Sequence, residues 1–297
     1  MTTPALRIGI DLGGTKTEIA VLDADGGIRL RRRVPTPGAG YDAMLSMLVR
    51  LVTEVEGELG ARGTVGVGIP GSISARTGLV RNANTVCLNG RPLAADLAAR
   101  MGREVRVAND ANCFALSEAK DGAGAGAEIV FGVILGTGCG GGLVIRGREI
   151  AGAQGIAGEW GHNPLPWPEP DELPGPPCWC GKRGCLETFL SGPGIARDHG
   201  GELDASAIAE AAARGDARAR ATLDRHASRL ARALATVIDI VDPTVVVLGG
   251  GVGQIVGLAD AVVQRLPNWV FCDAVSTRVV TPVHGDSSGV RGAAWLW

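Results

Sequence analysis

The sequence predicts an α/β protein built from two similar domains with a ligand cleft between them. One arrangement occurs twice along the 297 residues: a short apolar strand, a glycine-rich turn and a returning strand, followed by alternating helices and strands. A Gly/Ala-rich stretch at 122–126 separates the two occurrences. Internal repetition of this kind indicates two related units. We expect the ligand between them, because interfaces between domains are favoured binding places.

The first domain is expected over residues 1–120. Apolar strands at Leu6–Ile10, Ile19–Leu22 and Ile28–Val34 are joined by short turns and predict a β-meander. Apolar residues at helical spacing predict a helix at Tyr41–Leu59. The remaining elements are expected as strands at Val65–Ile69 and Val105–Ala108 and as helices at Leu93–Met101 and Ala111–Lys120.

The second domain is expected over residues 121–287 and begins with the same plan. A strand at Ile129–Leu135 leads through the glycine turn GTGCGGG into a strand at Leu143–Ile145 and a further short strand. An insertion rich in Pro and Cys follows at 159–187. The later elements are helices at Ser206–Arg214 and Ala217–Ile240, a strand at Val245–Leu248, and a last helix at 288–297 that is expected to pack back on the first domain.

Composition and charge exclude several classes of protein. A hydrophobic content of 45% and a net charge of −2 are typical of a soluble globular protein and lack the basic character of a nucleic-acid-binding domain. No apolar segment approaches membrane-spanning length, and the first residues lack the apolar core of a signal peptide. We therefore expect a cytoplasmic protein without a nucleic-acid or membrane partner.

The insertion at 159–187 carries the densest group of metal-binding side chains. His162, Cys178, Cys180 and Cys185 make a Cys₃His set, the usual composition of a structural zinc site. A reducing cytosol also favours a metal over a disulfide. Three core thiols with a hydrogen-bonded histidine are the alternative, but such crowding in a Pro-rich loop is unlike core cysteine. A zinc hydrolase is excluded by coordination, since four protein ligands leave no position for water.

Two glycine-rich turns between strands predict phosphate contacts. In the turn from Asp11 to Lys16, glycine lets backbone N–H groups approach a phosphate, and Asp11 is placed to hold a metal-bound water; a plain hairpin is the alternative. The turn from Gly136 to Gly141 matches the dinucleotide fingerprint G-x-G-x-x-G, but a strand and not a helix follows it. Because that fingerprint must open a helix, we reject a Rossmann site and predict a second phosphate-binding hairpin.

A third glycine turn, Gly249–Gly251, ends a buried strand and would let a flat purine lie on the backbone. A simple strand-to-helix turn is the alternative. Asn109 and Asp110 follow a strand and precede a helix, so Asp110 either points into the ligand crevice or serves as a helix cap. Together these features predict phosphoryl transfer, with Asp110 accepting the proton of the attacking hydroxyl.

The carboxylates at the borders of the insertion, Glu159 and Glu187, are candidates to bind a polyol by hydrogen bonds. His162 is placed to bind zinc through one ring nitrogen and a sugar hydroxyl through the other.

On its motifs the chain resembles the repressor–ORF–kinase sugar kinases of the actin and hexokinase superfamily. The likeness spans the chain and is carried by IDLGGTKTE, AGEWGH, the pattern C-x-C-G-x-x-G-C-x-E at Cys178–Glu187, and VVVLGGG. Within that family GIPGSIS, NANTVCLNG, VANDANC, GEWGHNPLPW and HGDSSGVRGAAWLW are most similar to the bacterial fructokinases, or manno(fructo)kinases. The linker 164–177 is longer and richer in proline than in many glucokinase relatives.

The resemblance implies two ribonuclease H-like domains, ATP and Mg²⁺ as cofactors, one structural Zn²⁺, Asp110 as the general base and a homodimer. It implies sugar ligands at Asn84, Asn109, Asp110, Glu159, His162 and Glu187, and zinc ligands at His162, Cys178, Cys180 and Cys185. It implies nucleotide contacts at Gly9, Asp11, Gly13, Gly14, Thr15, Lys16, Gly136, Thr137, Gly138, Gly140, Gly249, Gly250 and Gly251.

The function that follows is an ATP-dependent hexose kinase that converts fructose to fructose 6-phosphate and also accepts mannose. Glucose and N-acetylhexosamines are the alternative substrates within the family. A sugar-binding regulator without catalysis is a further alternative, but Asp110 is intact and the DNA-binding segment of the family's repressors does not precede the first glycine motif. We also expect the two domains to close on the sugar about a hinge at Gly122–Gly126.

Overall fold

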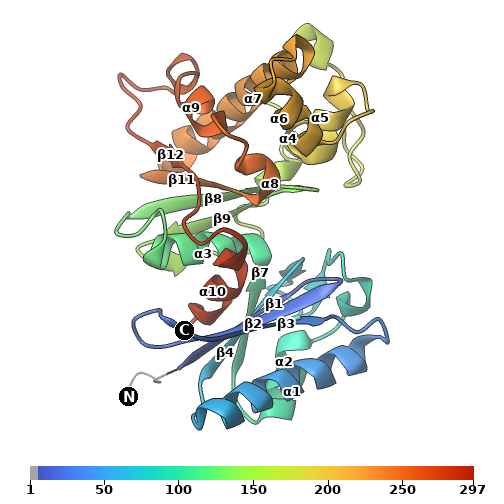
Figure 1. Cartoon of the computed structure of the whole chain (residues 1–297), viewed down its shortest axis with the longest axis vertical. Coiled ribbons are helices and arrows are strands. Elements are labelled where there is room, and N and C mark those ends of the chain that lie inside the picture. The colour runs from blue at the N-terminus through green and yellow to red at the C-terminus, as the bar shows by residue number, and fades with distance from the viewer. Residues whose placement is uncertain (1–5) are drawn as a thin grey trace.

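The computed structural model describes residues 6–297; residues 1–5, the start of the predicted first domain, lie outside this range. In the described part of the chain, two five-stranded sheets lie on either side of a central pair of helices, α3 (Asp110–Asp121) and α10 (Ser288–Ala294) (Figure 1). Further helices cover the outer face of each sheet. The molecule is thus layered: one group of helices covers the outer face of each sheet, and a third group lies between the two sheets.

The first sheet has the strand order β3-β2-β1-β4-β7. Its antiparallel meander consists of β1 (Arg7–Leu12), β2 (Lys16–Leu22) and β3 (Ile28–Pro35), and the strands β4 (Thr64–Ile69) and β7 (Val105–Asn109) add to it in parallel. The helices α1 (Tyr41–Leu59) and α2 (Leu93–Met101) cover its outer face (Figure 1). The apolar stripe of α1, including Met44, Leu48 and Val55, is buried there.

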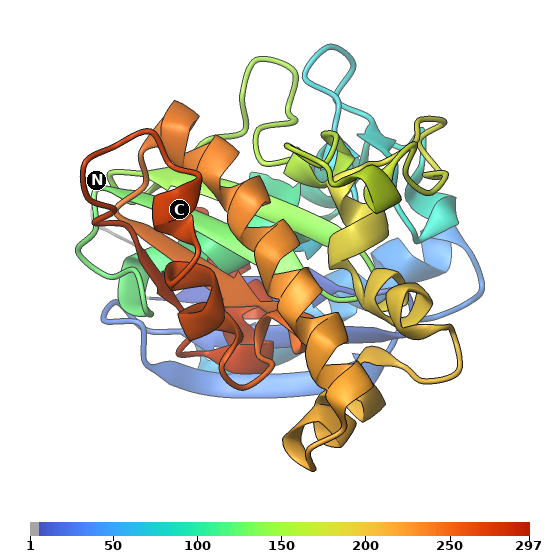
Figure 2. The same ribbon diagram turned by 90° about the horizontal axis from the view of Figure 1, so that it is seen from above.

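The second sheet repeats this order as β10-β9-β8-β11-β12. Its strands are β8 (Ile129–Leu135), β9 (Cys139–Ile145), β10 (Arg148–Glu149), β11 (Val245–Gly249) and β12 (Arg278–Val280). The long helix α7 (Ala217–Val241) crosses its outer face diagonally (Figure 2). The other helices of this half are α4 (Leu186–Leu190), α5 (Gly192–His199), α6 (Ala205–Ala213), α8 (Gly250–Gly253) and α9 (Leu258–Val263).

Short elements complete the chain. They are the hairpin β5 (Ser72–Ile73) and β6 (Val80–Arg81), and the 3-10 turns η1 (Val86–Leu88), η2 (Trp160–His162), η3 (Pro170–Glu172), η4 (Leu266–Asn268) and η5 (Gly285–Ser287). Among residues 6–297, no helix combines the length and the apolar character needed to cross a bilayer.

The two central helices pack closely against each other and against the sheets because the positions of closest approach are glycines, which have no side chain. A Cβ atom at Gly292 of α10 would lie 1.6 Å from the carbonyl oxygen of Cys113 in α3. At Gly9 of β1 it would lie 2.0 Å from the carbonyl oxygen of Val290, and at Gly142 of β9 it would lie 2.6 Å from that of Ala111. Gly9 was also expected to contact nucleotide phosphates; the close approach of α10 is a separate reason for glycine here, and the phosphate contact stays a prediction.

The order of strands and helices expected from the sequence is confirmed, and the differences have local causes. The glycine turn after β8 joins two antiparallel strands, as expected, so the Rossmann reading is correctly rejected. Helix α10 ends at Ala294 and not at the end of the chain. No element was expected at α4, α5, α9 or β12, because these elements are only three to eight residues long.

Two chain segments, one after α3 and one before α10, meet at a single buried carboxylate, that of Glu118. Glu118 of α3 accepts hydrogen bonds from the backbone N–H groups of Ala123, Val283 and His284 and from the hydroxyl of Ser288. Its side chain therefore joins the segment after α3 to the segment before α10. The predicted hinge at Gly122–Gly126 begins at this point and stays a prediction.

Substituting alanine at two helical glycines tests the packing of the central helices. Gly292→Ala should lower the free energy of unfolding by roughly 1–3 kcal/mol or more, because its methyl group meets backbone that cannot rotate away. Gly57→Ala is the matched control: Gly57 is exposed in α1 with nothing within 4 Å of its Cβ position, so it should gain about 0.5–1 kcal/mol. Thermal unfolding followed by circular dichroism measures both, and equal midpoints for the two variants would contradict this account.

Candidate active site

The two halves of the chain together enclose a cavity of about 520 Å³. Its lining includes all the sugar ligands expected from the sequence and part of the second glycine turn: Asn84, Asn109, Asp110, Glu159, His162 and Glu187, with Gly136, Thr137, Gly138 and Gly140. Asn82 and Trp179 also line it and were not expected. Residues separated by about a hundred positions in the chain thus meet at one place, as the predicted cleft requires.

Asn109 and Asp110 occupy the junction between β7 and α3. The sequence left open whether Asp110 caps the helix or points into the ligand crevice. Asn109 is the helix cap: its Oδ1 accepts from the N–H of Ala111 at 2.8 Å, and its Nδ2 donates to the carbonyl of Gly71 at 3.0 Å. Asp110 begins the helix and lines the cavity. Burial raises the pKa of Asp110 to about 6, although the N–H of Ala111 opposes the shift.

The first glycine turn lies beside this cavity. Among the described residues, none from Asp11 to Lys16 belongs to the cavity lining. Gly14 lies next to Thr85, whose hydroxyl would be 3.6 Å from a Cβ at Gly14, and Thr85 follows the lining residue Asn84. Burial raises the pKa of Asp11 to about 6, and the charge of Asp110 adds to the shift. The charges of the two carboxylates therefore interact, because this turn lies near Asp110.

The zinc ligands expected from the sequence come together. The ligand atoms of His162, Cys178, Cys180 and Cys185 all lie within 4.8 Å of one another. The Nδ1 of His162 lies 3.6 Å from the sulfur of Cys178, and the sulfurs of Cys180 and Cys185 are 3.6 Å apart. A tetrahedral zinc with Zn–S bonds of about 2.3 Å separates its sulfurs by about 3.8 Å. The donor set and its spacing thus fit zinc.

Glu187 connects the zinc loop, which is the segment 162–185 that carries the Cys₃His cluster, to the second glycine turn at Gly136–Gly141. One carboxylate oxygen accepts from the N–H of Cys139 at 3.1 Å, and the other accepts from the indole Nε1 of Trp179 at 2.7 Å. Trp179 also packs edge-on against the ring of His162, with the ring centres 4.8 Å apart. Because the zinc ligands surround Trp179 in sequence, the metal cluster would hold this carboxylate in place. The Cys-Trp-Cys spacing was the only sequence signal for Trp179.

A second cavity, of about 670 Å³, adjoins the first at Gly136 and Thr137. It lies among α5, α6 and α8, and Gly251 and Val252 contribute to its wall. Gly249 and Gly250 were also expected to contact the nucleotide base; this stays a prediction, and packing is a further reason for glycine at both positions. A Cβ at Gly249 would lie 2.4 Å from the ring of Phe114, and one at Gly250 would lie 2.2 Å from the carbonyl oxygen of Leu135.

Comparison with known proteins gives one consistent result. A family model described as the ROK family matches residues 7–297. An N-acetyl-D-glucosamine kinase from Citrobacter koseri is 42% identical over 296 residues, which cover 97% of this chain and 98% of the relative. An N-acetyl-D-glucosamine kinase from Shigella boydii is also 42% identical, with the same coverage.

Solved structures agree with this match. A ROK hexokinase from Thermus thermophilus superposes with a TM-score of 0.86 at 32% identity, covering 98% of this chain and 97% of that protein. A ROK glucokinase from Streptomyces griseus, in complex with glucose and AMPPNP, superposes with a TM-score of 0.77 at 29% identity, covering 97% and 98%. The predicted fold class, α/β with actin- and hexokinase-like halves around a cleft, is confirmed.

The spacing of the Cys₃His cluster generates a test of metal content. Elemental analysis of the purified protein, prepared without chelator, should find one zinc per chain. Cys180→Ser should lose the metal and weaken sugar binding, because Trp179 and Glu187 would no longer be held. Cys272→Ser is the matched control, since Cys272 is an exposed thiol outside the cluster. A wild-type protein without zinc would refute the assignment.

Proposed function

The chain belongs to the ROK family, and we propose that it is an ATP-dependent sugar kinase that phosphorylates N-acetylglucosamine on its primary hydroxyl. The observation that carries this proposal is the joining of two cavities at the turn Gly136–Thr137. The cavity with Asp110 suits a polyol, and the cavity with Gly251 suits a nucleotide. A phosphate chain in the turn between them would then point toward Asp110.

The reaction follows from this arrangement. The primary hydroxyl oxygen of the sugar attacks the γ-phosphorus, the bond between that phosphorus and the β–γ bridging oxygen breaks, and ADP leaves. Asp110 accepts the hydroxyl proton. Burial makes Asp110 a stronger base than a free aspartate, yet a pKa of about 6 leaves it mostly ionised at pH 7.

Two metals fit the chain in different roles. Burial raises the pKa of Asp11 and the neighbouring charge of Asp110 adds to the shift, so a divalent cation beside Asp11 would relieve the repulsion between the two carboxylates. Mg²⁺ bound with ATP supplies charge neutralisation of the phosphates. Zinc at His162, Cys178, Cys180 and Cys185 is structural, since four protein ligands close its coordination.

The choice of sugar rests on the relatives. N-acetyl-D-glucosamine kinases at 42% identity over nearly the whole chain support an N-acetylhexosamine. Fructose, converted to fructose 6-phosphate, is the second candidate, with mannose beside it. The observation that favours fructose is the motif likeness of GEWGHNPLPW and HGDSSGVRGAAWLW to the bacterial fructokinases.

A coupled assay of ADP release separates these substrates. With saturating ATP and Mg²⁺, we expect the highest kcat/KM with N-acetylglucosamine when it is compared with fructose, mannose and glucose. A site built to bond a particular polar group rejects sugars that lack it by a large factor. A higher kcat/KM with fructose would transfer the proposal to the second candidate. No ADP release with any of the four sugars would refute the kinase.

Replacing the proposed base tests its role. Asp110→Asn keeps the size of the side chain but cannot accept the hydroxyl proton, so turnover should fall roughly 10²- to 10⁴-fold. Zinc content, folding and ATP binding should stay near wild type. If Asp110 served only as part of the helix start, Asn would replace it with little effect. Turnover within a few-fold of wild type would therefore remove Asp110 from the chemistry.

The pH profile is the control for this variant. In the wild type, kcat/KM should rise as pH increases through about 6 and level off above it, because the base acts in its ionised form. In Asp110→Asn the residual activity should lack this inflection.

A further inference from the structure

The linker 164–177 joins the zinc ligands His162 and Cys178 and reaches far from the metal cluster. At its η3 turn, Glu172 is almost fully buried, with 7% of its surface exposed. A carboxylate buried to this degree costs free energy unless it is fully paired. Its partners therefore show what the linker is fastened to.

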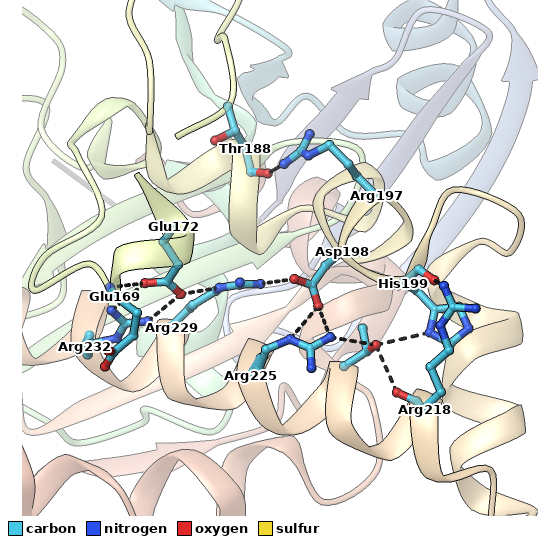
Figure 3. Close-up of polar contacts among 11 residues, drawn as sticks. Glu169, Glu172, Thr188, Arg197, Asp198, His199, Arg218, Arg225, Arg229 and Arg232 are labelled. Carbon is cyan, nitrogen blue, oxygen red and sulfur yellow. Dashed lines mark hydrogen bonds and ion pairs between the residues drawn. The ribbon is translucent and has the colours of Figure 1, made fainter. Parts of the chain in front are cut away.

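Glu172 is paired by two arginines of α7 (Figure 3). Arg229 donates from Nε at 2.7 Å, and Arg232 donates from both terminal nitrogens at 2.9 and 2.8 Å. The N–H of Glu169 donates a further bond at 2.8 Å. Burial alone would raise the pKa of Glu172, but the hydrogen bonds from the two arginines hold it at about 2. Glu172 is therefore ionised wherever the protein is folded near neutral pH.

The same arginines hold other parts of the linker and the end of α5. Arg232 also donates to the carbonyl oxygens of Pro166 and Trp167. Arg229 donates to Asp198 of α5 at 2.9 Å, so its guanidinium bridges two carboxylates. Both arginine side chains are nearly buried, at 6% and 2% exposed.

This cluster also contacts α4, the helix that carries Glu187. The guanidinium of Arg229 lies 5.3 Å from the ring centre of Phe189 in α4. Arg197, beside Asp198 in α5, donates to the carbonyl oxygen of Thr188 (Figure 3). Glu187 is thus fixed from two sides: the zinc loop lies at the start of α4, and the arginines of α7 and α5 lie along it.

We propose that Glu172, Arg229 and Arg232 form a metal-independent anchor that positions Glu187 and Trp179 for sugar binding. These three residues do not contact the sugar cavity, so they act as positioning residues. The proposal rests on the kinase function, because its test measures binding of the sugar that the kinase phosphorylates. Zinc fastens the two ends of the linker, and the buried ion pairs fasten its middle to α7. Arg is suited to this role, since its planar fork bonds two partners in fixed directions.

Steady-state kinetics with two variants and a control test this anchor. Glu172→Gln removes the charge that both arginines bind, and Arg229→Lys removes the fork that bridges Glu172 and Asp198. Arg225→Lys is the matched control, because Arg225 donates to Asp198 and Thr222 and is 44% exposed. Each protein is assayed with the sugar that the wild type phosphorylates best, and its zinc content and thermal midpoint are measured.

Glu172→Gln and Arg229→Lys should lower kcat/KM for the sugar roughly tenfold to a hundredfold, mainly through KM, because misplacement of a substrate-binding group by about 1 Å has effects of this size. In Glu172→Gln, KM for ATP should stay within about twofold of wild type and zinc should remain at one per chain. Arg225→Lys should match wild type. If Glu172→Gln fails to fold, Arg229→Lys decides the question, since it keeps the charge.

Three outcomes would go against the anchor. A lower thermal midpoint with an unchanged KM for the sugar would make the cluster purely structural. Loss of zinc in Glu172→Gln would show that the effect passes through the metal. An equal effect in Arg225→Lys would assign it to the charge network in general. A wild-type protein without kinase activity would instead overturn the proposed function, which separates the two failures.

Discussion

The fold depends on how closely two helices can approach each other between two sheets. Helices α3 and α10 meet at Gly292, where a single added methyl group would overlap the backbone of Cys113. Glycines of β1 and β9 make the same allowance on the outer sides of this pair. Because the interior is close-packed, a larger residue at these points would force the neighbouring backbone to shift. The cavity exists where it does because this pair of helices sets the separation of the sheets at one end of α3.

Electrostatics in the cavity follow from the same packing. Asp110 emerges at the first turn of α3, where it is desolvated and faces Asp11 and Glu159, so its proton affinity rises. Asn109, one position earlier, caps the helix by accepting from the N–H groups of Ala111 and Asn112, and the N–H of Ala111 donates to Asp110 as well. Glu187, in contrast, is held by two donors from different segments of the second half. The cavity is thus lined by Asp110, whose pKa is raised by burial, and by Glu187, which two hydrogen bonds hold in place.

Much of this arrangement could be predicted from the sequence, because strand and helix periodicity, glycine turns and the Cys₃His spacing are local signals. The packing contacts and ion pairs between distant segments could not be predicted. Gly9 and Gly249 were assigned to the nucleotide because a sequence shows a glycine but not the atom opposite it, which here belongs to Val290 and Phe114. The arginines of α7 resemble a solvated helix face, and their partner Glu172 is 57 and 60 positions away. Trp179 was missed because an aromatic residue between two cysteines gives no sign of the carboxylate that it bonds.

Glu118 has a mechanical consequence for the whole molecule. Its carboxylate binds both segments by which the chain passes between the layers, and it lies on α3 eight positions after Asp110, about 12 Å along the helix axis. When two parts of a molecule rotate relative to each other, the atoms near the rotation axis move least. Were the two sheets to rotate about α3, Asp110 at the start of that helix would move little, while Asn84 of the first half and Gly138 of the second half would move further. Asp110, the proposed proton acceptor, would then be the fixed point toward which sugar and nucleotide both move.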